Sequence, residues 1–232
     1  MTFTKRPAQA RGHTTMAWLD SWHTFSFADY VDPDHEFFRA LRVINEDYIA
    51  PMRGFPMHPH REMEILTYVV SGRLTHRDSM GNARTVHAGQ VQYMSAGHGV
   101  THSESNESPT APVHLLHIWI IPAIRDGTPV YGEWSPPENR TGPLTLIAAP
   151  KGGNGVLTLR QDAEIYLGEF KAGQTAVHAT KPHRGLWFQV ISGGLTVDGE
   201  ELAAGDGLEI ENASSCEIVA KSDARFLLFD LV

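Results

Sequence analysis

The chain has 232 residues, of which 41% are hydrophobic and 20% are charged, as expected for a globular protein with one large or two small domains. Its formal net charge is −8 and it contains no run of Lys or Arg, which argues against nucleic acid as a direct partner. Cys216 is the only cysteine, the N-terminus lacks the apolar core of a secretory signal, and the longest apolar stretch (residues 113–124) is too short to cross a bilayer, so we expect a cytoplasmic protein without membrane contact.

Short strands dominate the expected structure of the first half. Residues 13–31 are rich in aromatic side chains without a regular period, and we interpret them as an irregular segment that packs on a sheet. Strands are then predicted at residues 39–49, 64–70, 73–78, 83–87, 90–94 and 113–121. Short strands separated by Gly-, Asn- and Ser-containing turns are typical of a β-sandwich or β-barrel.

The second half repeats this pattern after a break. Residues 122–142 contain four prolines and several charges, which predicts a linker or an excursion between two halves. Strands are predicted again at residues 144–149, 156–159, 165–170 and 226–231. We find no long amphipathic helix, so the fold class that we predict is all-β.

Histidines cluster in the first half, where eight of the 13 lie between residues 58 and 117. Two motifs in this region, His58-Pro59-His60 and His102-Ser103-Glu104, each place two ligand-type side chains at positions i and i+2. Alternate residues of a strand point to the same face, so two such strands facing one another would gather three imidazoles and one carboxylate. We therefore predict a divalent transition-metal site made by His58, His60, His102 and Glu104.

Several neighbours of these motifs have two readings. Glu64 is interpreted either as a group that orients an imidazole or as a fifth ligand. His98 and His117 could each face the predicted metal site, and His23 is interpreted as a packing residue. Five apolar residues could line a pocket or belong to the ordinary core: Phe55, Met57, Met94, Val100 and Leu116. Cys216 has no recognisable activating partner and is read as a core residue.

An internal repeat supports two related halves. Residues 69–75 (VVSGRLT) match residues 190–196 (VISGGLT) at five of seven positions, an offset of 190 − 69 = 121. With offsets taken from this match and from the later Ala-Gly pairs, the four predicted ligands correspond to Ala179, Lys181, Ile218 and Ala220. The repeat therefore predicts that only the first half carries the metal.

Four segments together resemble the pirin family of the cupin superfamily. They are residues 18–27 (WLDSWHTFSF), His58-Pro59-His60 with residues 62–68 (EMEILTY), residues 78–81 (DSMG), and residues 94–97 (MSAG) with His102-Ser103-Glu104. The general cupin pattern is also visible, although Ser95 replaces its usual proline and the gap to His102 is longer. In pirin-like proteins the fourth ligand is the Glu that follows the third His, which is Glu104 here.

The resemblance implies a bicupin, that is, two antiparallel β-barrel (jelly-roll) domains. We expect an N-terminal cupin domain at residues 1–125 with the metal, and a degenerate C-terminal cupin domain at residues 126–232 without metal ligands. Fe(II) is the expected metal, with Mn, Co, Ni, Cu and Zn as alternatives.

The resemblance also implies two functions. The first is quercetin 2,3-dioxygenase activity, in which a flavonol is cleaved with dioxygen and carbon monoxide is released; Glu104 would accept the 3-hydroxyl proton. The second is a non-enzymatic, metal-dependent redox sensor that binds a protein partner. Both functions need the same four ligands, so the sequence leaves both open.

Overall fold

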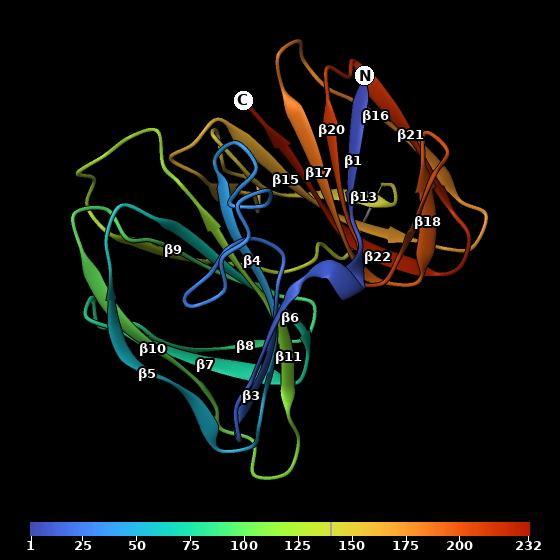
Figure 1. Cartoon of the computed structure of the whole chain (residues 1–232). Helices are drawn as coiled ribbons and strands as arrows, with labels where there is room; N and C mark the ends of the chain where they lie inside the picture. Colours follow the sequence, from blue (N-terminus) through green and yellow to red (C-terminus); the bar gives the residue numbers. More distant parts are fainter. Residues whose placement is uncertain (140) are drawn as a thin grey trace. The chain divides into compact units, whose positions relative to one another are not determined.

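Strands form almost the entire fold and make up four sheets (Figure 1). The computed structural model describes residues 1–139 and 141–232. These residues group into an N-terminal domain (residues 12–136 and 159–161) and a C-terminal domain (residues 1–11, 137–158 and 162–232, apart from residue 140). Each domain holds one seven-stranded and one four-stranded sheet, and the predicted all-β architecture of two domains is confirmed.

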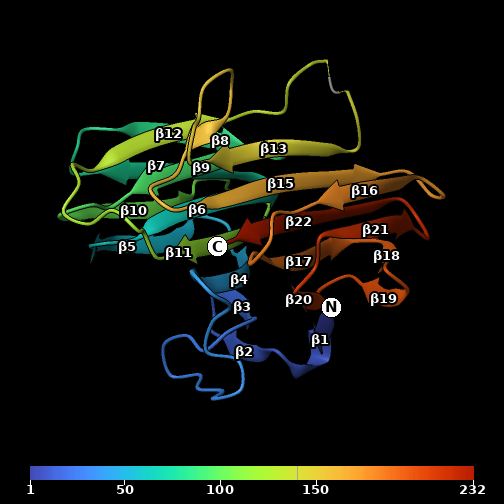
Figure 2. The same ribbon diagram turned by 90° about the horizontal axis from the view of Figure 1, so that it is seen from above.

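The large sheet of the N-terminal domain has the order β12-β9-β6-β11-β4-β3-β2, which Figure 2 shows from one edge to the other. Its strands are β12 (Val130–Trp134), β9 (Val91–Ser95), β6 (Glu64–Ser71), β11 (Val113–Ile120), β4 (Leu41–Ile49), β3 (Leu19–His23) and β2 (Gly12–Thr15). The small sheet has the order β5-β10-β7-β8, with β5 (Arg53–His60), β10 (Val100–Asn106), β7 (Arg73–Asp78) and β8 (Ala83–His87). All neighbouring pairs in both sheets are antiparallel.

Burial within this domain follows the alternation of the strands. In β10 every second residue from Val100 to Asn106 is buried, so one face of the strand points to the interior. A core that includes Leu74, Val86 and Leu115 fills part of this interior. The alternation places His102 and Glu104 on the buried face of β10, where apolar residues would otherwise continue the core.

The C-terminal domain repeats the arrangement. Its large sheet contains β1 (Thr2–Arg6), β20 (Gly207–Glu211), β17 (Gly185–Ser192), β22 (Ala224–Leu231), β15 (Ala163–Phe170), β13 (Leu144–Ala149) and β14 (Leu157–Thr158), in that order. Its small sheet has the order β16 (Thr175–Ala179), β21 (Ser215–Ala220), β18 (Gly194–Val197) and β19 (Glu200–Ala203). Only the short β13–β14 pair is parallel among the described strands. Phe170, Phe188 and Phe226 lie in its core.

The internal repeat in the sequence marks the same tight turn in both domains. Gly72 joins β6 to β7 with a φ of +82°, and Gly193 joins β17 to β18 with a φ of +77°. Side chains other than glycine rarely adopt this left-handed conformation. A Cβ atom on Gly193 would also approach the backbone oxygen of Asp223 to 2.1 Å. Two independent constraints therefore require glycine at this turn.

Two segments are more regular than their sequences indicate. Within the aromatic stretch at residues 13–31, the backbone forms β3 and the end of β2, where irregular structure was expected. Within residues 122–142 the structure contains β12, which pairs with β9, and residue 140 lies outside the described residues. In both cases pairing with a neighbouring strand outweighs weak local patterning, because a sheet edge supplies hydrogen-bond partners to almost any extended segment.

The grouping of residues also differs in detail from the expected division at residues 125 and 126. The first strand, β1, pairs with β20 of the C-terminal domain, and β12 pairs with β9 of the N-terminal domain. Residues 159–161 belong to the N-terminal domain. The backbone N–H of Arg160 donates to Glu64 over 3.0 Å, which holds this short segment in place. Within the described residues, no helix is long and apolar enough to cross a membrane.

Candidate metal centre and cavity

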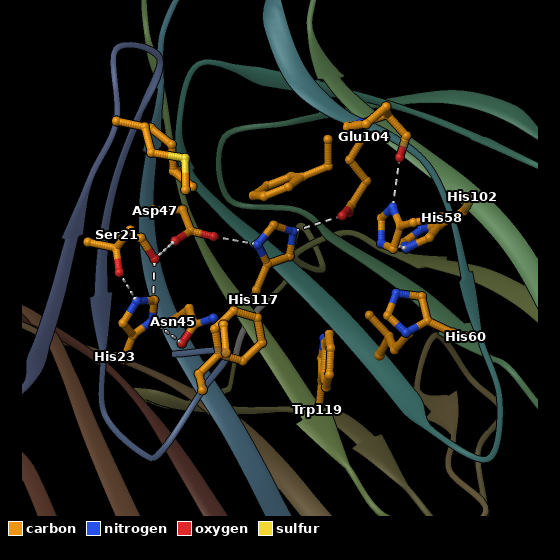
Figure 3. A pocket seen from close by; sticks show the side chains of 18 of the residues that line it. Ser21, His23, Asn45, Asp47, His58, His60, His102, Glu104, His117 and Trp119 are labelled. Carbon is orange, nitrogen blue, oxygen red and sulfur yellow. Dashed lines mark hydrogen bonds and ion pairs between the residues drawn. The ribbon is translucent and has the colours of Figure 1, made fainter. Parts of the chain in front are cut away.

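Three histidines on β5 and β10 converge in the N-terminal domain, as Figure 3 shows. His58 lies directly opposite His102 in the antiparallel register, and His60 follows on the same face of β5. Ring nitrogens of the three residues lie within 4.8 Å of one another. The strand geometry that the two sequence motifs predict is therefore present for these three imidazoles.

Hydrogen bonds fix which ring nitrogen of His58 is free. Its Nδ1 lies 2.8 Å from the carbonyl oxygen of Pro56. A carbonyl only accepts hydrogen bonds, so Nδ1 carries the proton and Nε2 keeps its lone pair. This is the arrangement that metal-binding histidines usually show, with one nitrogen anchored to the protein and the other facing the ion.

A second chain fixes His102 in the same way. The carboxylate of Asp78 accepts a hydrogen bond from Nε2 of His76 over 3.0 Å, so a His76 ring with a single proton holds it on Nε2 and keeps a lone pair on Nδ1. That nitrogen lies 3.5 Å from Nδ1 of His102, a long contact, and can only accept a proton from it. In this arrangement the proton of His102 lies on Nδ1, and Nε2 is free to bind a metal. Neither His76 nor Asp78 was selected from the sequence, although their spacing of two places both on the buried face of β7.

The free nitrogens of His58 and His102 face each other at 3.0 Å. At this distance the two nitrogens either share a proton in a hydrogen bond or, with both protons on the Nδ1 atoms, can hold a cation between them. Two nitrogen ligands at right angles, each about 2.1 Å from one ion, would be separated by about 3.0 Å. The donor set and its spacing therefore fit a transition-metal ion.

Burial keeps these imidazoles neutral. Burial, with a smaller contribution from His58, lowers the pKa of His60 to about 4. Burial also lowers the pKa of His102 to about 3, although the nearby Glu104 carboxylate opposes the shift. Both rings are thus unprotonated at neutral pH, which is the state that binds metals.

Glu104 lies beside this cluster with both carboxylate oxygens engaged. Oε1 accepts a hydrogen bond from the Thr67 hydroxyl over 3.0 Å, and Oε2 accepts one from Nε2 of His117 over 2.9 Å. The carboxylate also lies within 4.8 Å of ring nitrogens of His76 and His102. Each carboxylate oxygen has a second lone pair, so these bonds leave room for a further partner. Glu104 as the fourth ligand stays a prediction.

His117 joins two carboxylates. Its Nδ1 lies 2.6 Å from Asp47 and its Nε2 2.9 Å from Glu104, and both nitrogens must donate because carboxylates only accept. Burial alone would lower the pKa of His117, but the two carboxylates, Glu104 above all, raise it to about 10. Burial alone would raise the pKa of Glu104, but the His117 imidazolium holds it below the usual range. Glu104 is therefore ionised at neutral pH.

A cavity of about 420 Å³ opens beside the three histidines. Aromatic side chains form one part of its wall: Trp18, Phe27, Phe55 and Trp119. Polar side chains form another part: Thr14, Ser21, His23, Asn45 and Asp47. In Figure 3 the histidine cluster and the polar group lie at opposite sides of the view, with His117 and Trp119 between them. This combination of an apolar wall with a few polar groups is typical of a small-molecule site.

The remaining candidates from the sequence fall in different places. Of the five apolar pocket candidates only Phe55 lines this cavity, and Met94 is fully buried in a separate core cluster. His98 is exposed. Glu64 is buried and accepts hydrogen bonds from Tyr93, Ser95 and the backbone of Arg160. Its carboxylate therefore links β6 to β9 and to residues 159–161.

The C-terminal domain carries other residues at the equivalent positions. His178 on β16 pairs with Cys216 on β21, as His58 pairs with His102. Ile218 pairs with Val197, as Glu104 pairs with His76. The counterpart of His58 is thus His178, whereas the linear offset had placed Ala179 there. Burial raises the pKa of the Cys216 thiol to about 12, so Cys216 is a protonated core residue.

Comparisons with known proteins agree with this architecture. Residues 4–120 match the Pirin family model, and residues 146–231 match the Quercetinase C-terminal cupin domain. A protein of Escherichia coli (strain K12) named quercetin 2,3-dioxygenase is 45% identical over 226 residues, which cover 97% of each chain.

Two solved structures show the same fold. The crystal structure of YhhW from Escherichia coli has a TM-score of 0.96 at 44% identity and covers 100% of this chain and 98% of the other. The structure of bacterial pirin YhhW in complex with nickel(II) has a TM-score of 0.94 at 43% identity and covers 99% of each chain. With both of its domains accounted for, this chain is a bicupin and belongs to the pirin family.

Proposed function

We propose that this protein is a metal-dependent dioxygenase that cleaves a flavonol of the quercetin type with dioxygen and releases carbon monoxide. The observation that carries the proposal is the pair of facing imidazole nitrogens, 3.0 Å apart, at the edge of an aromatic-walled cavity of about 420 Å³. The name of the E. coli relative at 45% identity supports this substrate class.

The residues that would hold the metal are His58, His60, His102 and Glu104. Fe(II) is the ion that we expect, and the nickel(II) complex of the E. coli protein makes nickel an essential arm of any test. When bound, a divalent transition metal would supply Lewis acidity, which favours the deprotonated 3-hydroxyl of a flavonol, together with open coordination positions.

The chain itself contributes a base and a dry, shaped site. Glu104 is ionised at neutral pH and buried, so it can accept the 3-hydroxyl proton on one of its oxygens. His117 and Thr67 keep the carboxylate oriented while this happens. Trp119 and Phe55 present flat apolar surfaces to the cavity, which suit a planar aromatic substrate and exclude water around the reacting ring.

The experiment is aerobic turnover of quercetin by metal-free protein that has been reconstituted in parallel with Fe(II), Mn, Co, Ni, Cu and Zn. Carbon monoxide release is measured for each arm. We expect carbon monoxide in proportion to quercetin consumed for at least one metal, with Fe(II) foremost. Tight metal binding without carbon monoxide from any arm would contradict the proposal and leave the redox-sensing function as the alternative.

A further inference from the structure

Asn45 offers the cavity a hydrogen-bond donor that no protein group uses. Its side chain is 4% exposed and lines the cavity wall. Its Oδ1 lies 2.9 Å from Nδ1 of His23, whereas within residues 1–139 and 141–232 no group is hydrogen-bonded to its Nδ2. Because Asn45 lines the cavity, this amide donor is open to a ligand or water, and a bound molecule that covers it without accepting its hydrogen bond would lose about 1–3 kcal/mol.

The orientation of this amide follows from a chain of fixed hydrogen bonds that begins at Asp47. A carboxylate cannot donate a hydrogen bond, so the Ser21 hydroxyl donates its only proton to the hydrogen bond with Asp47. The Ser21 oxygen can then only accept, and it lies 3.5 Å from Nδ1 of His23. A lone pair on Nδ1 would face this oxygen unfavourably, so Nδ1 carries the proton.

The same proton decides how Asn45 is placed. The protonated Nδ1 of His23 must meet an acceptor, which is Oδ1 of Asn45. The other ring nitrogen, Nε2, lies 2.9 Å from the Thr14 hydroxyl, so both ring nitrogens have a hydrogen-bond partner. Nδ2 of Asn45 is left to point away from His23 and toward the centre of the cavity, as Figure 3 shows.

The strand register places this donor relative to the reacting centre. Asn45 pairs with His117 on β11 and with His23 on β3. Since His117 holds Glu104, the Asn45 donor lies one strand further along the sheet than that contact, a step of about 4.8 Å. A flavonol whose 3-hydroxyl reaches Glu104 can therefore extend one of its rings toward Asn45.

We propose that Asn45 is a specificity-determining residue that donates a hydrogen bond to a phenolic oxygen on the part of the flavonol that lies away from the 3-hydroxyl. This inference rests on the proposed function. It adds that the cavity recognises the pattern of hydroxyl groups, because a flavonol without that oxygen would leave the buried amide unpaired. A site with a dedicated hydrogen-bonding group rejects the analogue that lacks its partner.

The test measures flavonol binding to zinc-loaded protein, so that no turnover is needed. Binding is detected as quenching of the fluorescence of Trp18 and Trp119, which lie in the cavity wall. Three ligands are compared: quercetin, its analogue without hydroxyls on the 2-phenyl ring, and its analogue without the 5- and 7-hydroxyls. We expect the wild-type protein to bind one analogue about five- to ten-fold more weakly than quercetin, the effect of one neutral hydrogen bond.

Two variants locate the effect. Asn45→Leu removes the amide at similar volume, and Asn45→Asp keeps the acceptor for His23 while removing the donor. Both should reduce the preference for quercetin over the affected analogue to about two-fold or less, while the affinity of Asn45→Leu for that analogue stays near the wild-type value. The matched control is Met16→Leu, which changes another side chain that lines the cavity but leaves the hydrogen bonds that orient Asn45 in place, and it should keep the wild-type ratio.

The outcomes separate the two proposals. If wild-type protein binds no flavonol, the proposed function fails and this inference fails with it. If flavonols bind but wild-type protein discriminates against neither analogue, the inference alone is overturned, without recourse to any variant. The same holds if the preference survives in a folded Asn45→Leu or Asn45→Asp protein.

Discussion

The two domains have matching strand orders but bury different groups at the same point of the fold. In the N-terminal domain, the Nε2 atoms of His58 and His102 face each other at 3.0 Å beside a cavity. In the C-terminal domain, the counterpart of His58 is His178, whose Nε2 lies 2.9 Å from the carboxylate of Asp230. The comparison teaches that the β-scaffold tolerates either arrangement, and that a few inward-facing residues decide whether a domain can bind a metal.

Charge pairing closes the C-terminal site. Asp230 occupies the position of Trp119, because it pairs with Leu186 on β17 as Trp119 pairs with Ile65 on β6. Its carboxylate contacts both His178 and Arg184, and Arg184 reaches Asp162 over 2.7 Å. His178 thus has a carboxylate as its partner where the Nε2 of His58 faces a second imidazole. Within the described residues, the groups of side chains able to hold a metal all lie in the N-terminal domain.

Removal of a ligand should produce the largest change. His58→Ala or His102→Ala takes one of the facing nitrogens away, and we expect metal affinity to fall by more than the roughly 100-fold that loss of a supporting residue can cause. Metal content after dialysis, measured by mass spectrometry, reports the effect. His178→Gln and His98→Ala serve as controls and should retain the wild-type content. A His58→Ala or His102→Ala protein with both metal and turnover would disprove the site assignment.

The C-terminal ion pairs should matter for stability instead. Arg184→Leu leaves the buried Asp230 carboxylate without its cation, and breaking such a pair costs about 3–5 kcal/mol. Native-state hydrogen exchange should show the loss in β15, β17 and β22, with the metal affinity of the N-terminal domain unchanged. If Arg184→Leu lowers the free energy of unfolding by less than about 1 kcal/mol, these ion pairs do not stabilise the C-terminal domain.

A smaller effect is expected from the groups that orient the metal-binding rings. His76→Phe keeps a ring beside Tyr131 but removes the acceptor for Nδ1 of His102. Loss of a partner that fixes a ligand's tautomer typically lowers metal affinity by about 10- to 100-fold. Isothermal titration with zinc measures this directly, and circular dichroism checks the fold. Unchanged affinity would show that the long 3.5 Å contact between the two rings carries no weight.

Acid should weaken the C-terminal domain through Asp230. Burial alone would raise the pKa of Asp230, but hydrogen bonds from His178 and Arg184 hold it below its usual value. Because the folded-state pKa lies below the unfolded value of about 3.9, the stabilisation is complete above about pH 5 and is lost as the pH falls through the folded-state pKa. Urea midpoints between pH 7 and pH 3 should fall for wild-type protein, and Asp230→Asn should show a shallower acid slope. Equal slopes would exclude Asp230 as the cause.

Much of the fold follows from the sequence because strands and turns are local features. The strands at residues 73–78, 83–87 and 144–149 have the predicted bounds. β12 was missed because its pairing with β9, not its own pattern, makes it a strand. The linear offset failed at His178 because the loops between equivalent strands differ in length: His58 and His178 are 178 − 58 = 120 residues apart, but His102 and Cys216 are 216 − 102 = 114 apart.

Only part of the candidate site, likewise, follows from local features of the sequence. The i, i+2 motifs were sufficient to bring His58, His60 and His102 together, because strand alternation is a backbone property. The contacts of Glu104 with His117, and of His117 with Asp47, depend on strands distant in sequence and on side-chain rotamers. The orientation of Asn45 depends on four further hydrogen-bonding groups. Such networks have no local signature in the chain.

The most direct measurement is anomalous diffraction from crystals of the metal-loaded protein, collected at the absorption edge of the bound metal. We predict one ion per chain, held by His58, His60, His102 and Glu104, and none between His178 and Cys216. An ion in the C-terminal domain, or an N-terminal ion that does not contact the facing nitrogens of His58 and His102, would contradict this prediction.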